Sequence, residues 1–225
     1  MYDIVQSYTR YGQIRDGEAR SDTLFKTALA ASFGRSVVLP HKLENLFLII
    51  RDGLKSTACK NIVEFGAFKG GSALFMGYLL RKLHPGAKLY ALDTFTGMPE
   101  TDPTKDLHRA GEFADCDLDG FRRLCSQLEL DHVIEIVQGR IEDTWPRLAQ
   151  TPIGLAHIDV DIYSAVAFAQ SAAWGNLCPG GYLIYDDAEY PTCLGATHAA
   201  EEFKARHGLL SEQVHPHWVV RKPGS

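Results

Sequence analysis

Four aspartates follow two predicted strands, each near the point where the strand ends. Asp159 and Asp161 follow the apolar run 153–158, and Asp186 and Asp187 follow the run 182–185. The carboxyl ends of parallel strands meet at one edge of a sheet, so neighbouring strands would bring these carboxylates close together. Charges so close repel one another unless a cation neutralises them, and Mg²⁺ and Ca²⁺ prefer oxygen ligands. We therefore expect a divalent metal site at this edge.

An alternative reading leaves these acids solvated and apart. Asp161 and Asp187 each precede an expected helical segment and could serve as helix caps. His157 shares a strand face with the aspartates because strand side chains alternate with a period of two. We expect it to be a packed, hydrogen-bonded histidine rather than a metal ligand.

A second group of residues could hold a nucleoside. Residues 61–72 read as a strand, a tight turn and a helix start, where Gly66 permits the turn and Gly71 keeps side chains away. Backbone N–H groups at a helix start can meet a carboxylate, and Ser72 adds a hydroxyl. Asp93 ends the next predicted strand, where an acid can accept both ribose hydroxyls. Together these features predict that the chain binds a nucleoside cofactor.

The third predicted strand is followed by Asp143, for which two readings stay open. Its carboxylate could reach an adenine amino group, or it could simply cap an exposed helix. The glycine spacing around Gly66 differs from the G-x-G-x-x-G of dinucleotide-binding turns. This difference counts against a nicotinamide-dependent oxidoreductase.

The elements that must position these residues alternate between strand and helix from residue 61 onwards. Such alternation predicts an α/β domain with a mostly parallel sheet and helices on both faces. We expect a seven-stranded sheet whose last two strands close it as a pair. The expected strands are 61–65, 88–92, 133–137, 153–158, 182–185, 209–214 and 217–221, and the expected helices are 22–33, the segment after Pro40, 71–83, 118–129, 143–149, 162–176 and 195–207.

The 225 residues are expected to form a single domain. Residues 1–58 would be an N-terminal helical extension, followed by a Rossmann-like core over residues 59–225. The segment 94–117 is rich in glycine, proline and charge, and irregular segments of this length are usually lids or binding loops. The apolar helices of the extension could pack against a second copy of the chain, giving a homo-oligomer.

Composition excludes several classes of partner. The net charge is -5 and no long basic run occurs, so we expect neither a nucleic-acid-binding nor a membrane-surface protein. The chain opens with charged residues rather than a signal peptide, and its longest apolar run, 46–50, is too short to span a bilayer. We expect a cytoplasmic protein.

Cysteine usage also favours a reducing compartment. The cysteines are odd in number, scattered, and never spaced C-x-x-C, so we expect free thiols rather than disulfides or a zinc site. They are Cys59, Cys116, Cys125, Cys178 and Cys193.

Five segments together form a recognisable set: VEFGAFKGGS (63–72), LDTFTGMP (92–99), GRIEDTWP (139–146), HIDVDIY (157–163) and GGYLIYDD (180–187). In this order they resemble the macrocin O-methyltransferase (TylF) family of class I S-adenosylmethionine-dependent enzymes, over residues 61–205. The resemblance implies a class I methyltransferase fold with S-adenosylmethionine and Mg²⁺, or another divalent cation, as cofactors. It also implies transfer of a methyl group to a hydroxyl of a small molecule, above all a sugar of a glycosylated secondary metabolite.

The resemblance assigns roles to single residues. The magnesium ligands of the family fall on Asp159, Asp186 and Asp187, and the base that accepts the hydroxyl proton falls on Asp161. A base is useful because an alcohol has a pKa far above neutrality, which Mg²⁺ lowers less than zinc does. The resemblance assigns Glu64, Gly66, Ser72 and Asp93 to the cofactor, and the expected set of cofactor residues also includes Gly71, Asp143 and Asp159.

Three other functions stay open at this point. A catechol- or phenol-type O-methyltransferase also uses strand-end acids with magnesium, although often with Asn at the position of Asp187. A nicotinamide oxidoreductase would share the Rossmann-like sheet. A non-catalytic S-adenosylmethionine-binding or scaffolding protein would need no metal, so the four aspartates argue against it.

Overall fold

The computed structural model describes residues 17–224, so residues 1–16 of the expected extension lie outside the described residues. Within this range six strands form one sheet in the order β3-β2-β1-β4-β5-β6. The first five strands are parallel, and β6 runs antiparallel to β5. The strands are β1 (Ile62–Phe65), β2 (Leu89–Asp93), β3 (Ile134–Gln138), β4 (Ile153–Ile158), β5 (Leu177–Tyr185) and β6 (Trp218–Arg221).

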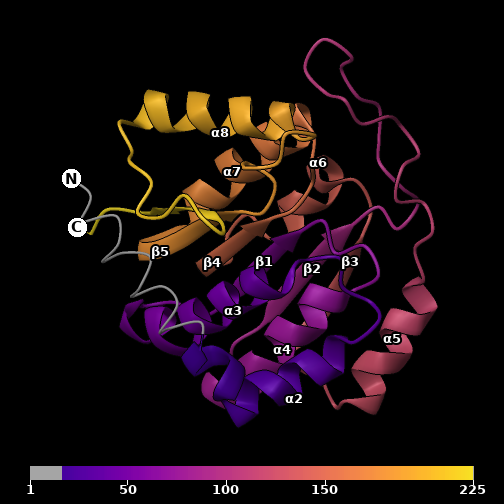
Figure 1. The fold of residues 1–225 in the computed structure, drawn as a ribbon, viewed down its shortest axis with the longest axis vertical. Coiled ribbons are helices and arrows are strands. Elements are labelled where there is room, and N and C mark those ends of the chain that lie inside the picture. Colours follow the sequence, from indigo (N-terminus) through magenta and orange to yellow (C-terminus); the bar gives the residue numbers. More distant parts are fainter. Residues whose placement is uncertain (1–16, 225) are drawn as a thin grey trace.

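Helices cover both faces of the sheet, which confirms the expected α/β architecture (Figure 1). The helices α2 to α5 pack on one face, and α7 and α8 pack on the other. The α-helices are α2 (Thr23–Ser32), α3 (Pro40–Leu48), α4 (Gly71–Leu83), α5 (Leu118–Gln127), α6 (Ile141–Thr144), α7 (Tyr163–Asn176) and α8 (Leu194–His207), with a π-helix at Ile49–Gly53 and 3-10 helices at Leu54–Ser56 and Trp145–Arg147.

Alternate residues of each strand enter two separate hydrophobic cores. In β1, Ile62 packs into the core beneath α2, α3 and α4, whereas Val63 and Phe65 pack into the core beneath α7 and α8. Because both faces are covered, the central strands are continuous apolar runs rather than alternating ones. Glu64 shares its face with Ile62, so it is buried on the side of α3.

The strand order reverses between β1 and β4, which lie side by side at the centre of the sheet. In open α/β sheets, ligands bind in the crevice outside the carboxyl ends of strands at such a reversal. The turn after β1 and the segment after β4 therefore meet where a ligand is expected. This topology brings Gly66 and Asp159 to the same place.

The sheet has one strand fewer than expected among the described residues. The segment 209–214 makes only a single antiparallel bridge, Gln213 with Val219, instead of a ladder. Its apolar residues Leu210 and Val214 are exposed, so no burial stabilises an extended pairing. The prediction of a strand at 209–214 was wrong.

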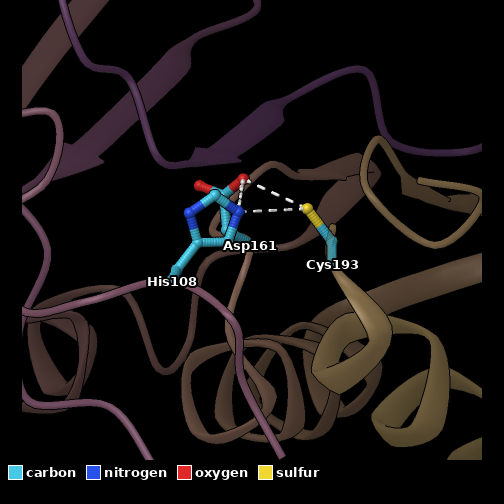
Figure 2. A group of neighbouring side chains, drawn as sticks. All are labelled: His108, Asp161 and Cys193. Atoms are coloured by element: carbon cyan, nitrogen blue, oxygen red, sulfur yellow. Dashed lines mark hydrogen bonds and ion pairs between the residues drawn. The ribbon is translucent and has the colours of Figure 1, made fainter. Parts of the chain in front are cut away.

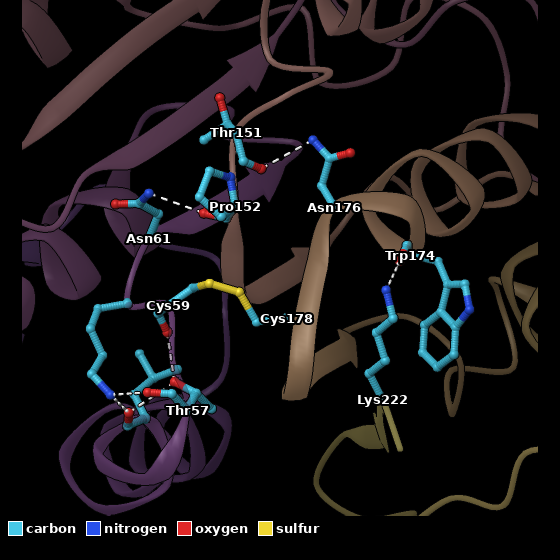
Figure 3. Close-up of a disulfide and its surroundings, with 11 residues drawn as sticks. Thr57, Cys59, Asn61, Thr151, Pro152, Trp174, Asn176, Cys178 and Lys222 are labelled. Carbon is cyan, nitrogen blue, oxygen red and sulfur yellow. Dashed lines mark hydrogen bonds between the residues drawn. A yellow bond between two sulfur atoms is a disulfide. The ribbon is translucent and has the colours of Figure 1, made fainter. Parts of the chain in front are cut away.

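The prediction that all cysteines are free thiols was also wrong, because Cys59 and Cys178 form a disulfide (Figure 3). The bond joins the segment before β1 to the start of β5, and the two Cα atoms lie 6.1 Å apart. This separation is in the ordinary range for a disulfide. The two residues are 119 positions apart, so their spacing in the sequence gave no sign of the pairing. Cys116, Cys125 and Cys193 are free.

Among the described residues, no helix combines the length and the apolar character that crossing a bilayer requires.

Candidate active site

A cavity of about 350 Å³ opens at the carboxyl ends of the central strands. Its size suits a small-molecule site. The walls come from the turn after β1, the end of β2, the segments after β4 and β5, and the loop 94–117, here called the β2–α5 loop. The residues predicted from the sequence that line it are Gly66, Asp93, Asp159, Asp161, Asp186 and Asp187.

Gly66 is required by the close approach of two backbone segments. Its φ is +90°, and a Cβ at this position would lie 1.6 Å from the carbonyl oxygen of Asp159. A side chain would therefore collide with backbone that cannot move without opening the sheet. The glycine turn leaves the wall of the cavity beside β1 free of side chains.

Gly71 and Ser72 lie at the start of α4, beside the cavity rather than in its wall. A Cβ on Gly71 would lie 2.2 Å from the backbone nitrogen of Ser36, so the glycine lets the segment before α3 pack against the helix start. Ser72 is buried. The structure thus gives Gly71 a packing role that the sequence did not indicate.

Asp93 ends β2 and organises the backbone around the cavity. Its Oδ2 accepts a hydrogen bond of 2.7 Å from the N–H of Phe68, and its Oδ1 accepts one of 2.7 Å from the N–H of Phe95. These bonds link the glycine turn to the β2–α5 loop. Oδ1 also accepts a 3.4 Å hydrogen bond from Oγ1 of Thr94, so Oδ2 is the oxygen that keeps a second lone pair for a ligand.

Two further residues assigned to the cofactor, Glu64 and Asp143, also lie away from the cavity wall. Glu64 is fully buried, and its Oε1 lies 3.2 Å from Nδ1 of His157. Asp143 is exposed on α6, where Ile141 and Glu142 line the cavity instead. Successive helix residues point about 100° apart, so Asp143 points away when its two neighbours face inward.

Three aspartates converge where β4 and β5 end. One carboxylate oxygen each of Asp159, Asp186 and Asp187 lies within 4.8 Å of the others. Removal from bulk water raises the pKa of Asp159 and of Asp187 well above the ordinary value, and the neighbouring carboxylates raise both pKa values further. The cluster therefore carries repulsion that a cation would relieve.

Asp186 differs from its two neighbours because donors surround it. Lys42 Nζ donates to its carbonyl oxygen and, over 3.1 Å, to Oδ2, while His217 Nε2 lies 2.9 Å from Oδ1. His157 Nε2 lies 3.5 Å from the same Oδ1. Burial by itself would raise the pKa of Asp186, but the two histidines outweigh it and hold the pKa well below the usual range.

Lys42 and His217 were not identified from the sequence. Both side chains are fully buried, which is rare for lysine. Burial would lower the pKa of Lys42, but the charge and hydrogen bond of Asp186 outweigh it and raise that pKa. In the sequence, the only sign that Lys42 has a role in the site is that a charged residue stands within an apolar helical pattern. His157 is packed and hydrogen-bonded, in agreement with the expectation for it.

Asp161 does not join the other three aspartates but forms a separate group with His108 and Cys193 (Figure 2). Its φ is +58°, and its N–H donates a 2.9 Å hydrogen bond to Oδ2 of Asp187. This turn of the backbone separates its carboxylate from theirs. Burial is the main cause that raises the pKa of Asp161.

A family model described as Macrocin-O-methyltransferase (TylF) matches residues 9–219. The chain is 26% identical over 205 residues to an 8-demethyl-8-(2,3-dimethoxy-alpha-L-rhamnosyl)-tetracenomycin-C 4'-O-methyltransferase of Streptomyces olivaceus, covering 87% of this chain and 77% of that protein. It is 27% identical over 184 residues to the Mycinamicin III 3''-O-methyltransferase of Micromonospora griseorubida, covering 77% and 71%.

A solved structure shares the same fold. The O-methyltransferase NovP superimposes with a TM-score of 0.71 at 22% identity, over 82% of this chain and 80% of NovP.

Proposed function

Since this chain belongs to the macrocin O-methyltransferase (TylF) family and is an S-adenosylmethionine-dependent O-methyltransferase, we propose that it methylates a sugar hydroxyl of a glycosylated secondary metabolite. The names of two similar proteins describe methyl transfer to the 4' oxygen of a rhamnosyl-tetracenomycin C and to the 3'' oxygen of mycinamicin III. The observation that carries the proposal is the convergence of the glycine turn, Asp93 and three aspartates on one cavity.

S-adenosylmethionine would bind between the glycine turn and the end of β2. Asp93 would accept a ribose hydroxyl at Oδ2, where one lone pair is free, and a second at Oδ1 in place of the long bond from Thr94. Glu64 Oε2 is buried without a hydrogen-bond partner among the described residues, so this carboxylate would support the amino-acid end of the cofactor. Asp143 has no comparable support, since it is exposed.

We propose Mg²⁺, or another divalent cation, as the second cofactor, held by Asp159, Asp186 and Asp187. The donor set fits because one carboxylate oxygen of each residue lies within 4.8 Å of the others, and burial together with the neighbouring carboxylates raises the pKa of Asp159 and of Asp187, which a cation would oppose. When bound, the cation would act as a Lewis acid that lowers the pKa of the acceptor hydroxyl. Lys42 and the histidines around Asp186 would keep this ligand ionised and oriented.

Asp161 would accept the proton of the acceptor hydroxyl. It lines the cavity, and the hydrogen bond from its N–H to Asp187 fixes its backbone beside the aspartate cluster. A raised pKa makes a carboxylate a stronger base, which suits proton transfer near neutral pH. The proton would move from the hydroxyl oxygen to a carboxylate oxygen of Asp161 as the methyl group is transferred.

We propose that the β2–α5 loop is a lid that excludes water from this reaction. Met98 and Phe113 line the cavity from the loop. Asp106 anchors it, because its Oδ1 accepts a 2.8 Å hydrogen bond from the N–H of Tyr163 at the start of α7. We also propose the domain division that the sequence predicts, with one domain over 1–225 that consists of an extension over 1–58 and a core over 59–225.

A homo-oligomer through the N-terminal region remains part of the proposal. Phe33, Val37 and Leu39 lie between α2 and α3 and are exposed by 87%, 63% and 41%. A second copy of the chain would cover these apolar side chains, and sedimentation analysis would detect it. The cytoplasmic location expected from the sequence stays a prediction.

The test is methyl transfer from labelled S-adenosylmethionine to a panel of acceptors, with and without EDTA. Glycosylated metabolites should be methylated in the presence of Mg²⁺, and EDTA should stop the reaction until Mg²⁺ is restored. Transfer to catechols in preference to sugars would assign the chain to the other acceptor class. Full activity of metal-free enzyme would refute the metal.

A further inference from the structure

Three side chains beside the aspartate cluster form a second potential ligand set (Figure 2). His108 comes from the β2–α5 loop, Asp161 follows β4, and Cys193 precedes α8. Cys193 Sγ lies 3.5 Å from His108 Nε2 and 3.5 Å from Asp161 Oδ1, and those two atoms lie 3.8 Å apart. Figure 2 shows all three side chains pointing toward one another. We call this group the His–Asp–Cys cluster.

The two sulfur distances match one face of a zinc coordination tetrahedron, and the 3.8 Å between His108 Nε2 and Asp161 Oδ1 exceeds the expected separation by about 0.2 Å. With Zn–S of about 2.3 Å and Zn–N and Zn–O of about 2.0–2.2 Å, tetrahedral ligand atoms lie roughly 3.3–3.6 Å apart. The His–Asp–Cys cluster is thus close to ligand geometry already, without any movement of the backbone. We propose that this cluster binds a borderline-soft divalent cation, Zn²⁺ above all, with its fourth position open to the cavity.

The surroundings of His108 support a ligand role. Glu112 Oε2 lies 2.6 Å from His108 Nδ1, so the carboxylate holds the proton on Nδ1 and leaves the lone pair of Nε2 directed at the cluster. Histidine ligands of metals ordinarily have such an outer carboxylate partner. The hydrogen bond from His108 is also the main cause that lowers the pKa of Glu112.

The loop that carries His108 is held in place on both sides of this residue. The N–H of Met98 donates to the carbonyl of Glu112 over 2.7 Å, and the N–H of Gly111 donates to the carbonyl of Met98 over 2.9 Å. On the other side, Asp106 is tied to α7. Hydrogen bonds on both sides of His108 therefore hold it beside Asp161 and Cys193, as a preorganised metal ligand requires.

Donor chemistry separates the two cation sites. Mg²⁺ prefers the three carboxylates of Asp159, Asp186 and Asp187, whereas a nitrogen, oxygen and sulfur set suits Zn²⁺. On binding, the Cys193 thiol would lose its proton to solvent and form the sulfur–metal bond as a thiolate. The hydrogen bond between Cys193 and Asp161 would be replaced by two bonds to the ion.

This site would regulate the reaction, a consequence that rests on the proposed function. An ion bound to His108 would tie the β2–α5 loop to the segments after β4 and before α8, holding the cavity closed. Asp161 would be occupied as a ligand and could not accept a proton. Zn²⁺ should therefore inhibit methyl transfer while Mg²⁺ supports it.

The binding test uses the full chain freed of metal, with excess Mg²⁺ to occupy the three carboxylates, titrated with Co²⁺ as a visible substitute for Zn²⁺. One equivalent should produce a thiolate-to-cobalt charge-transfer band and the intense visible bands of tetrahedral cobalt, and Zn²⁺ should remove both. Cys193→Ser should abolish the charge-transfer band, whereas the matched control Cys125→Ser, at a buried free thiol in α5, should retain it. Glu112→Gln should weaken cobalt binding about 10–100-fold.

A missing band, or a band that survives in Cys193→Ser, would overturn the site. If Cys193→Ser unfolds in the absence of metal, His108→Gln serves instead, because His108 is partly exposed and its loss removes a ligand without opening the core. In the activity arm, Zn²⁺ should inhibit the wild type and Cys125→Ser but not Cys193→Ser. A cobalt signal without methyl transfer to any acceptor would reject the proposed function and leave the site standing.

Discussion

At the scale of single residues, the environment of each carboxylate determines what that carboxylate can do. Lys42, His157 and His217 surround Asp186 and hold its pKa low, whereas burial and neighbouring carboxylates raise the pKa of Asp159 and of Asp187. Asp161 lies apart from them because its backbone turns through a positive φ. Adjacent acids of the same type can therefore serve as metal ligands and as a base.

Asp186→Asn should lower kcat by about 100-fold or more, because Lewis-acid stabilisation is worth several kcal/mol and the neutral amide is a poor ligand. Binding of S-adenosylhomocysteine, measured by calorimetry, should stay close to that of the wild type. EDTA treatment of the wild type is the control that involves no folding change. Equal loss of turnover and of cofactor affinity would instead assign Asp186 to the cofactor.

Asp93→Ala should weaken binding of S-adenosylhomocysteine by about 10–100-fold, the effect of losing hydrogen bonds to a charged acceptor. Asp93→Asn is the matched variant, since it keeps one acceptor oxygen for the backbone N–H of Phe68 or Phe95. Calorimetry at saturating Mg²⁺ measures both. Unchanged affinity in the alanine variant would remove Asp93 from the cofactor site.

The buried His157 should make the stability of the metal-free protein depend on pH. Burial alone would lower the pKa of His157, but hydrogen bonds and charges of Asp186 and Glu64 outweigh it and raise the pKa from 6.5 to about 9. A raised pKa means that this stabilisation is complete below pH 6.5 and is lost as the pH rises through about 9. The loss should be on the order of 3 kcal/mol.

Chemical denaturation of metal-free protein between pH 6 and 10 measures this slope. His157→Gln should lack the slope, because glutamine does not titrate. His217 works in the opposite direction, since burial lowers its pKa to about 4 and its stabilisation is lost on acidification. A wild-type curve that runs parallel to that of His157→Gln would contradict the charged state of His157.

At the scale of elements, the two central strands position the site through the packing of their ends. The turn after β1 and the segment after β4 approach so closely that only glycine fits at position 66. The same approach brings Asp159 to the cofactor side of the cavity. Element packing and site geometry are therefore set by one contact.

Gly66→Ala should lower the free energy of unfolding by at least about 2 kcal/mol, because its Cβ would overlap the backbone of Asp159 and its φ is +90°. Gly175→Ala is the matched control, since a Cβ there meets open space within α7. Its free energy of unfolding should be unchanged or raised by up to about 1 kcal/mol. Urea denaturation measures both, and equal stability of the two variants would contradict the close approach.

At the scale of the whole molecule, the disulfide Cys59–Cys178 links the segment before β1 to the start of β5. It lies at the amino ends of β1 and β5, whereas the cavity lies at the carboxyl ends of the strands. It should therefore affect stability rather than catalysis.

Cys59→Ser should lower the free energy of unfolding by about 2–5 kcal/mol, because the bond closes a loop of 119 positions in the unfolded chain. Cys116→Ser, at a free and partly exposed thiol, is the control and should change it little. A reductant should bring the wild type to the stability of Cys59→Ser. Five reactive thiols in the denatured, unreduced chain would contradict the pairing.

The sequence by itself determined the features that depend on local order. Strand and helix alternation, the glycine turn and the acids at Asp93, Asp159 and Asp186 all follow from residues close together in the chain, together with the general rule that ligands gather at the carboxyl ends of parallel strands. The same local patterns carried the family resemblance. The fold class and the cavity edge were therefore predictable.

Only the tertiary structure decided which distant residues meet. Cys59 pairs with Cys178, Lys42 reaches Asp186, and His108 reaches Cys193 because the strand order and the path of the β2–α5 loop bring these segments together. The strand expected at 209–214 did not form for the same kind of reason, since Leu209 packs against the core but Leu210 and Val214 are exposed and only a single bridge joins the segment to β6. The periodicity of apolar residues indicates which face of a helix or strand is buried, but it does not indicate which distant segment packs against that face.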